Sequence, residues 1–218
     1  MTIPRIIKFI ATKILPRKAV EKLRPPVAFD NLYPWLNYTF SKLMRDARIK
    51  EKPQYAWGVM QGAAIAKVLK IPKISVIEFG VAGGAGLLTL ESVAEAVENI
   101  TNVDIDVFGF DTGAGLPKPV DFRDQPNMWF EGQFPMDHER LVSALSRASL
   151  CLGPVKETIP SFIAGNPAPI AFVSFDLDLY SSTRDALTLF QSDYLHLLPR
   201  VISYFDDIFG HTFNDFCG

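Results

Sequence analysis

Apolar positions along this chain follow two spacings, one typical of helices and one typical of buried strands. Short apolar runs predict strands over 73–79, 106–110, 149–152, 170–175 and 200–205. Helical spacing predicts helices over 30–50, 54–70, 87–99, 137–147 and 184–195, with a weak helical turn over 159–164. The first two helices are joined around Lys52-Pro53. Strands that alternate with helices imply βαβ units, right-handed crossovers and a mostly parallel sheet, so the pattern predicts a doubly wound α/β domain.

Two acidic clusters follow the last two predicted strands. Asp176 and Asp178 come directly after one strand, and Asp206 and Asp207 after the next. Carboxylates at the carboxyl ends of parallel strands point into one crevice, where together they are costly unless a cation joins them. Oxygen ligands without Cys or His favour Mg²⁺, Mn²⁺ or Ca²⁺ over zinc. The alternative roles are a solvated turn for Asp206-Asp207, and capping of residues 181–183 or pairing with Arg184 for Asp178.

A glycine-rich loop lies between the first predicted strand and its helix. The segment 78–86 reads Glu-Phe-Gly-Val-Ala-Gly-Gly-Ala-Gly, and Ala82 puts it out of register with a dinucleotide fingerprint. Glycines let the backbone approach a ligand, and the helix start offers unpaired N–H groups. The acidic Glu78, two residues before Gly80, suits a ligand with a cationic amino group such as S-adenosylmethionine. The alternative is a turn that serves only tight packing.

Asp111 ends the second predicted strand, 31 residues after Gly80. A carboxylate at that position can accept hydrogen bonds from the ribose hydroxyls of an adenosine ligand. The alternative is that Asp111 only caps the following turn. With the strand order 3-2-1-4-5, the glycine loop and Asp111 lie on a cofactor side and the acidic clusters on a substrate side. That division predicts a transferase with two ligands.

Charge is spread unevenly and separates the N-terminus from the rest. Residues 1–26 carry a net charge of +6 and the remainder −8, within an overall −2. An acidic body disfavours nucleic acid as a partner. The basic segment has isoleucines at helical spacing, which indicates a cap on its own domain or on a dimer mate, in preference to a membrane-surface helix. With two cysteines, no disulfide framework and no bilayer-spanning run, a cytoplasmic location is expected.

These residues together resemble the class I S-adenosylmethionine-dependent methyltransferases, and most closely the metal-dependent macrocin O-methyltransferases. The resemblance runs from about Tyr55 to the C-terminus and includes Phe110-Asp111-Thr112 and 176–183. It implies a Rossmann-like domain over 54–218 behind a basic helical cap over 1–53. It also implies O-methylation of a small molecule such as a sugar or natural product. The residues expected at the site are, by role: Glu78, Gly80, Gly84, Gly86 and Asp111 for the cofactor; Asp176, Asp178, Asp206 and Asp207 for Mg²⁺; His211 and Asp206 for catalysis.

Three departures from the family pattern bear on the acceptor and on the domain end. Leu198-Pro199-Arg200 replaces a Gly-Gly turn. The loop 124–134 is rich in aromatic residues, which indicates a lid over an acceptor with apolar bulk in preference to a packed surface. The family continues past strand five with a helix and a hairpin, but this sequence stops at Gly218, so a C-terminally truncated chain is expected. Two other functions stay open: a non-catalytic methyltransferase-like binding module and, less favoured, an NAD-dependent oxidoreductase.

Overall fold

The computed structural model of the protein describes residues 32–206, and from Leu36 onward the chain forms one compact unit. The predicted N-terminal basic helix, Asp207 and His211 lie outside the described residues. The segment after Asp206, on which the prediction of a C-terminal truncation depends, also lies outside the described residues. Over residues 32–206, no helix is long and apolar enough to cross a membrane.

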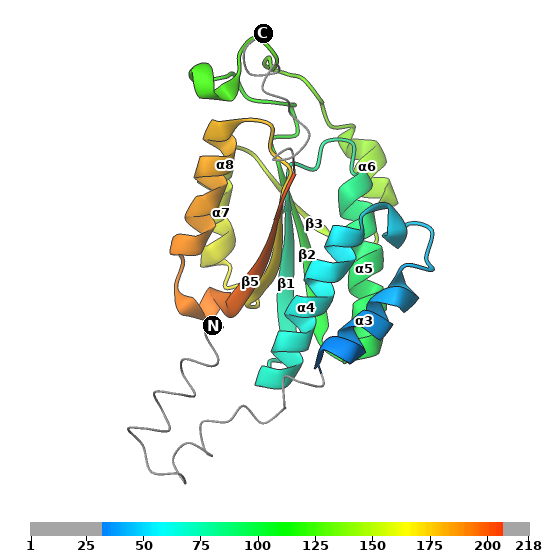
Figure 1. Ribbon diagram of the computed structural model, residues 1–218. Coiled ribbons are helices and arrows are strands. Elements are labelled where there is room, and N and C mark those ends of the chain that lie inside the picture. The colour runs from blue at the N-terminus through cyan, green and yellow to red at the C-terminus, as the bar shows by residue number, and fades with distance from the viewer. Residues whose placement is uncertain (1–31, 207–218) are drawn as a thin grey trace, which may run out of the picture. The chain divides into compact units, whose positions relative to one another are not determined.

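Five parallel strands form one sheet in the spatial order β3-β2-β1-β4-β5 (Figure 1). The strands are β1 (Lys73–Phe79), β2 (Asp104–Asp111), β3 (Ser149–Leu152), β4 (Ile170–Phe175) and β5 (Leu197–Phe205). The predicted Rossmann-like class and strand order are confirmed. The order reverses between β1 and β4, and at such a point the crossover connections diverge and leave a crevice at the carboxyl ends of the strands.

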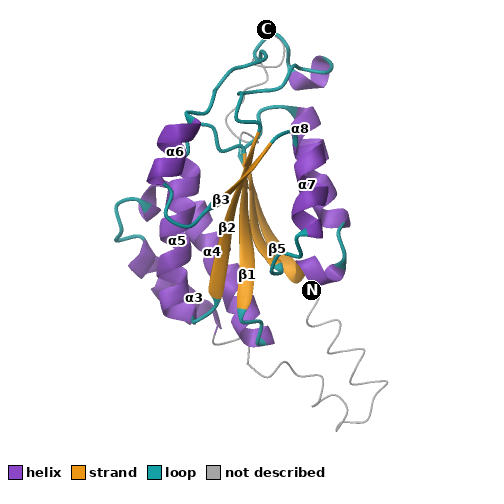
Figure 2. Ribbon diagram, turned by 180° about the vertical axis from the view of Figure 1, so that it is seen from behind, coloured by secondary structure: helices purple, strands orange, loops and turns teal. Residues whose placement is uncertain are grey.

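Helices cover both faces of the sheet (Figures 1 and 2). One face carries α4 (Pro53–Leu69) and α5 (Ala85–Thr101), and the other carries α7 (Val155–Ala164) and α8 (Tyr180–Ala186). The remaining elements are α3 (Leu32–Leu43), α6 (His138–Ala144) and the short 3₁₀ turns Ile49–Glu51, Phe122–Asp124, Leu187–Gln191 and Tyr194–His196. Because helices lie on both faces, the central strands are buried on both: all of β4, and β1 after Lys73.

A row of phenylalanines crosses the carboxyl end of the sheet. Phe79 pairs in register with Phe110 and with Phe175, and Phe175 pairs with Phe205. Neighbouring ring centroids lie 4.8 Å apart for Phe79 and Phe110, 5.4 Å for Phe79 and Phe175, and 4.6 Å for Phe175 and Phe205. The next residues along the chain are Gly80, Asp111, Asp176 and Asp206. The register therefore brings these four sequence-predicted site residues to the same edge of the sheet.

Helices α7 and α8 each begin four residues earlier than predicted, and α3 ends at Leu43 where the sequence predicts a helix to residue 50. Helix α7 begins at Val155 and runs through Pro160, whereas the sequence predicts only a helical turn over 159–164. Proline removes one hydrogen bond of the helix. Burial of Ile159 and the packing of Phe162 on Phe108 and Phe110 offset that loss. Helix α8 begins at Tyr180 and ends at Ala186, whereas the sequence predicts a helix over 184–195. Its start is set by a distant cap: Asp124 accepts a hydrogen bond from the Ser181 backbone N–H at 2.8 Å.

Candidate functional site

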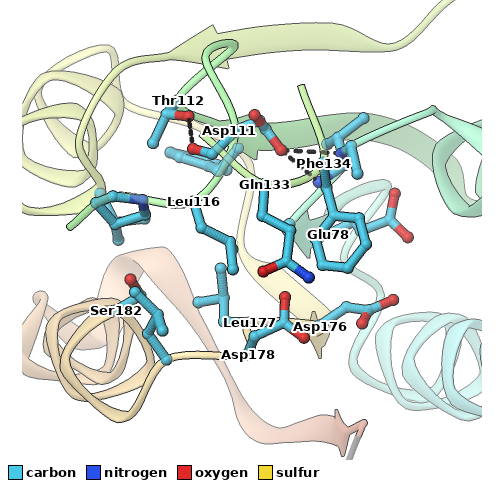
Figure 3. Close-up of a pocket in the computed structure, with 18 of the residues that line it drawn as sticks. Glu78, Asp111, Thr112, Leu116, Gln133, Phe134, Asp176, Leu177, Asp178 and Ser182 are labelled. Atoms are coloured by element: carbon cyan, nitrogen blue, oxygen red, sulfur yellow. Dashed lines mark hydrogen bonds between the residues drawn. The ribbon is translucent and has the colours of Figure 1, made fainter. Parts of the chain in front are cut away.

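A cavity of about 590 Å³ opens at the carboxyl ends of β1, β2 and β4. Its walls are the glycine loop, Asp111 with the following turn, the segment 176–179 after β4, and the start of α8. Gln133 and Phe134, from the long loop between β2 and α6, extend between the Asp111 side and the Asp176 side (Figure 3). The cavity lies at the point where the strand order reverses, as the sequence predicts.

Three glycines of the loop are required by close packing. Gly80 and Gly84 have φ angles of +85° and +86°, which favour glycine, and a side chain at Gly80 would overlap the backbone oxygen of Asp176. A side chain at Gly86 would overlap the Glu78 carboxylate. Gly83 differs from the other three glycines of the loop, because a Cβ atom added there would have no neighbouring atom within 4 Å. The loop therefore presents bare backbone to the cavity at Gly83.

Glu78 is the buried acid of the cavity. Only 1% of the residue is exposed, and its Oε1 accepts a hydrogen bond of 2.5 Å from the Tyr55 hydroxyl. Its Oε2 is buried and has no hydrogen-bond partner among the described residues. Burial raises the pKa of Glu78 to about 8, since removal from water disfavours the charged form. An unsatisfied carboxylate oxygen of a residue that lines a cavity is suited to receive a cationic donor.

Asp111 holds the glycine loop to the end of β2. Its Oδ2 accepts hydrogen bonds of 2.9 Å from the backbone N–H groups of Val81 and Ala82, and its Oδ1 accepts one of 2.7 Å from Gly113 (Figure 3 shows the first two). These bonds use three of the roughly four lone-pair directions of a carboxylate. Asp111 therefore both caps the loop and lines the cavity, and it has room for about one ribose hydroxyl where the sequence suggested two.

A lysine lies against the acidic side of the cavity. The Lys52 ammonium is 3.4 Å from Asp176 Oδ2, 3.4 Å from the Tyr55 hydroxyl oxygen and 4.8 Å from the Tyr55 ring centroid. The sequence indicates that a cation should join the carboxylates, and Lys52 is a cation that the structure places there. Sequence reasoning missed both Lys52 and Tyr55. The unbalanced acidic charge at the strand ends was a signal for a cation such as Lys52, whereas no sequence signal indicated Tyr55.

The described residues do not assemble the predicted magnesium site. Within residues 32–206, no three His, Cys, Asp or Glu side chains are grouped so that they could hold a metal ion. Asp176 pairs with Lys52, and Asp206 accepts a 3.0 Å hydrogen bond from the Tyr204 hydroxyl. Asp178 lines the cavity, while Asp206 is not among the residues that line it. Two of the alternative partners for Asp178 are engaged elsewhere: Ser181 by Asp124, and Arg184 by Asp185.

The histidines of the described part do not reach the cavity. His138 is the first residue of α6, and His196 lies in a 3₁₀ turn with Nε2 3.3 Å from Asn166 Oδ1; neither lines the cavity. The sequence predicts that His196 sits in a helix with a structural role, and the structure places it in this short turn instead. His211, the predicted base, lies outside the described residues and stays a prediction.

The aromatic loop between β2 and α6 closes on itself at the cavity edge. Leu116 donates a backbone hydrogen bond to Gln133 and accepts one from Gly132, at 2.7 and 2.9 Å. Asp124, 1% exposed, accepts hydrogen bonds from Val120 and Ser181 and so ties the loop to α8. Several apolar side chains of the loop are exposed: Val120, Phe122, Phe130 and Phe134. The loop therefore has an anchored base and an apolar outer surface beside the cavity.

Comparison with known proteins shows a similarity of fold to a methyltransferase of known structure. No protein-family model and no curated protein matches the chain. The crystal structure of CalS11, a calicheamicin methyltransferase, aligns with a TM-score of 0.54 and 24% identity over 83% of this chain and 79% of that chain. The apo structure of CalS11, described as a TDP-rhamnose 3′-O-methyltransferase in calicheamicin biosynthesis, aligns with a TM-score of 0.44 and 22% identity over 88% and 85%. At 24% identity the first alignment shows a shared fold.

Proposed function

We propose that this protein is an S-adenosylmethionine-dependent methyltransferase that methylates a hydroxyl oxygen of a small molecule. The observation that carries the proposal is the buried, unpartnered Oε2 of Glu78 beside a glycine-lined cavity within the described part of the chain. The ammonium of the cofactor would satisfy this oxygen, because a charged donor in a dry site forms a strong hydrogen bond with a carboxylate. The likeness of fold to CalS11, a calicheamicin methyltransferase, makes a natural product the acceptor class to test first.

The residues fit the cofactor as follows. Gly83 leaves space for close approach of a ligand, and the N-terminus of the 17-residue helix α5 favours the cofactor carboxylate. Asp111 offers its remaining lone pair to a ribose hydroxyl. When bound, the cofactor supplies an electrophilic methyl group on a sulfonium centre. The cavity volume of about 590 Å³ lies within the range of small-molecule sites, roughly 300–1,000 Å³.

On the acceptor side, the chain positions the substrate and excludes water. Leu116, Phe134 and Leu177 line the cavity with apolar surface, and Asp176 and Asp178 offer oxygen acceptors (Figure 3). A carboxylate that accepts the acceptor's hydroxyl proton would hold its oxygen in line with the methyl group, and such positioning accounts for much of the rate of a displacement. These roles belong to the chain's own side chains, since no group of three metal-ligating residues occurs within the described range 32–206.

Calorimetric titration with S-adenosylhomocysteine and with NAD tests the proposal. We expect S-adenosylhomocysteine to bind, and we expect Glu78→Gln to weaken it by about tenfold to a hundredfold, since a hydrogen bond to a charged group is lost. Glu95→Gln, an exposed carboxylate of α5, is the matched control and should bind normally. Binding of NAD without S-adenosylhomocysteine would overturn the proposal and favour an oxidoreductase. Binding without methyl transfer to any hydroxyl acceptor would favour the non-catalytic module.

The magnesium hypothesis is tested separately by chelation. It requires Asp176 and Asp206 to act together with Asp207. If Mg²⁺ assists the reaction, EDTA abolishes methyl transfer to a responding acceptor and leaves the affinity for S-adenosylhomocysteine unchanged. If methyl transfer survives EDTA, the protein's own charged side chains, and not a metal ion, position the acceptor hydroxyl.

A further inference from the structure

We propose that Tyr55 and Lys52, at the start of α4, are positioning residues that hold the cofactor side and the acceptor side of the cavity in one hydrogen-bonded network. The proposal rests on the proposed function, and it concerns residues that do not themselves react. The network runs from Glu78 through Tyr55 and Lys52 to Asp176, with Ser174 beside Tyr55.

The direction of the hydrogen bonds follows from their chemistry. The Lys52 ammonium can only donate, and it lies 3.4 Å from the Tyr55 hydroxyl oxygen. Ser174 Oγ also donates to that oxygen, at 3.0 Å. The single phenolic hydrogen of Tyr55 is therefore directed to Glu78 Oε1, at 2.5 Å. Each lone pair and the hydrogen of the phenol are used, so the orientation of Tyr55 is determined by its three partners.

This orientation determines which oxygen of Glu78 serves the cavity. Tyr55 holds Oε1, so Oε2 is the oxygen left for a ligand. Tyr55 is fully buried, and Gly86 leaves no room for a side chain between α5 and the carboxylate. With one oxygen held and the surroundings packed, Glu78 has little freedom to rotate away, and preorganisation of this kind increases affinity.

Lys52 extends the network to the acceptor side. Its ammonium contacts both the Tyr55 hydroxyl and Asp176 Oδ2, the first carboxylate after β4. Both Lys52 and Tyr55 belong to the first turn of α4 or its N-cap, so a shift of that helix end moves both contacts together. The geometry points to energetic coupling between Glu78 and Asp176 through these two side chains.

Two ligands, one with and one without the amino acid group of the cofactor, test this inference separately from the proposed function. S-adenosylhomocysteine carries the amino acid group, whereas 5′-methylthioadenosine keeps the adenosine and thioether but lacks it. In Tyr55→Phe we expect S-adenosylhomocysteine to bind about tenfold more weakly and 5′-methylthioadenosine to change less than about twofold. Tyr194→Phe, at an 80% exposed tyrosine, is the matched control.

Lys52→Met supplies a second variant in case Tyr55→Phe disturbs the fold, because the Lys52 side chain is 23% exposed and less demanding to replace. We expect it to weaken S-adenosylhomocysteine by about threefold to tenfold with 5′-methylthioadenosine unchanged, and Lys50→Met, at an exposed lysine, to have no effect. The double variant should lose less than the product of the two single losses, since both act on one network.

The outcomes distinguish the two proposals. If the wild-type protein binds neither ligand, the proposed function fails. If it prefers S-adenosylhomocysteine and both variants keep that preference in full, the positioning role of Tyr55 and Lys52 is overturned while the proposed function stands. If the losses of S-adenosylhomocysteine affinity in the two single variants multiply in the double variant, Tyr55 and Lys52 act independently and the proposed coupling is overturned.

Discussion

Glu78 makes the stability of the ligand-free protein depend on pH. Burial raises its pKa from 4.5 to about 8, so between these values the folded protein holds a proton that the unfolded chain has released. The stabilisation is complete below pH 4.5 and is lost as the pH rises through about 8. We expect the melting temperature of the wild-type protein, measured by circular dichroism, to fall more steeply between about pH 5 and pH 8 than that of Glu78→Gln, and the two curves to run parallel above that range. Parallel curves between about pH 5 and pH 8 would contradict a raised pKa.

The same carboxyl group should couple ligand binding to proton release. Near neutral pH the free site holds a proton on Glu78, and an ammonium bound at Oε2 stabilises the charged form instead. Titration with S-adenosylhomocysteine at about pH 7, in buffers of different ionisation enthalpy, should therefore report release of close to one proton. With 5′-methylthioadenosine, which has no ammonium, we expect none. Equal proton release with both ligands would rule out Glu78 as the source.

Two glycines of one loop offer a matched comparison. In Gly86→Ala the new methyl group would overlap the Glu78 carboxylate, whereas in Gly83→Ala it would meet open space. We expect Gly86→Ala to lower the free energy of unfolding by about 1 to 3 kcal/mol, because a packed site cannot take an extra methyl without strain. Gly83→Ala should change it by less than about 0.5 kcal/mol. Urea unfolding curves measure both, and equal losses would show that Gly86 is not held by packing.

Strand register brings the candidate site residues together, whereas the Asp124 side chain positions the aromatic loop beside them. The aligned phenylalanines bring Gly80, Asp111, Asp176 and Asp206 to one edge, because in-register parallel strands end at the same level. The aromatic loop has no such ladder. Its position depends on Asp124, which reaches the first turn of α8 across 57 residues of sequence.

Loss of the Asp124 carboxylate should loosen both the loop and α8. Asp124→Ala removes acceptors from Val120 N, Ser181 N and Ser181 Oγ, so we expect a loss of about 2 to 4 kcal/mol in the free energy of unfolding. Limited proteolysis should cut the loop 117–134 faster in this variant. Glu131→Ala, at an exposed carboxylate of the same loop, is the control and should be nearly neutral. Equal cleavage rates in the two variants would contradict the anchoring role.

Across the whole domain, the site depends on how closely α4 approaches the sheet. A side chain at Gly58 would overlap the ring of Phe172 on β4, so the glycine allows the contact that carries Tyr55 to Glu78 and Ser174. We expect Gly58→Ala to cost about 1 to 3 kcal/mol of stability. It should also weaken S-adenosylhomocysteine more than 5′-methylthioadenosine. Lys67→Ala, on the exposed face of α4, is the control. Lower stability without any change in ligand preference would separate helix packing from the site.

Much of the fold could be predicted because its signals are local. Three of the five strands, β1, β3 and β4, have the predicted bounds. For β1 and β4 the reason is that a strand covered on both faces needs a short unbroken apolar run. The start of α8 could not be predicted, because its cap comes from a loop far away in sequence. For the site, the sequence places Glu78 and Asp111 at strand ends correctly. Their hydrogen-bond partners depend on packing that no spacing encodes.

The sequence by itself determined the doubly wound class, the strand order and the set of acidic and glycine residues that meet at one edge. The class follows from periodicity and from the handedness of crossovers, both properties of short segments, and the order is one that doubly wound sheets commonly adopt. Only the tertiary structure decided what each side chain does there. It put Lys52 against Asp176, 124 residues away in sequence, and Tyr55 against Glu78, and it engaged Asp111 with the loop backbone. Such pairings arise because buried polar groups must find partners wherever packing brings them, and packing is a property of the whole chain.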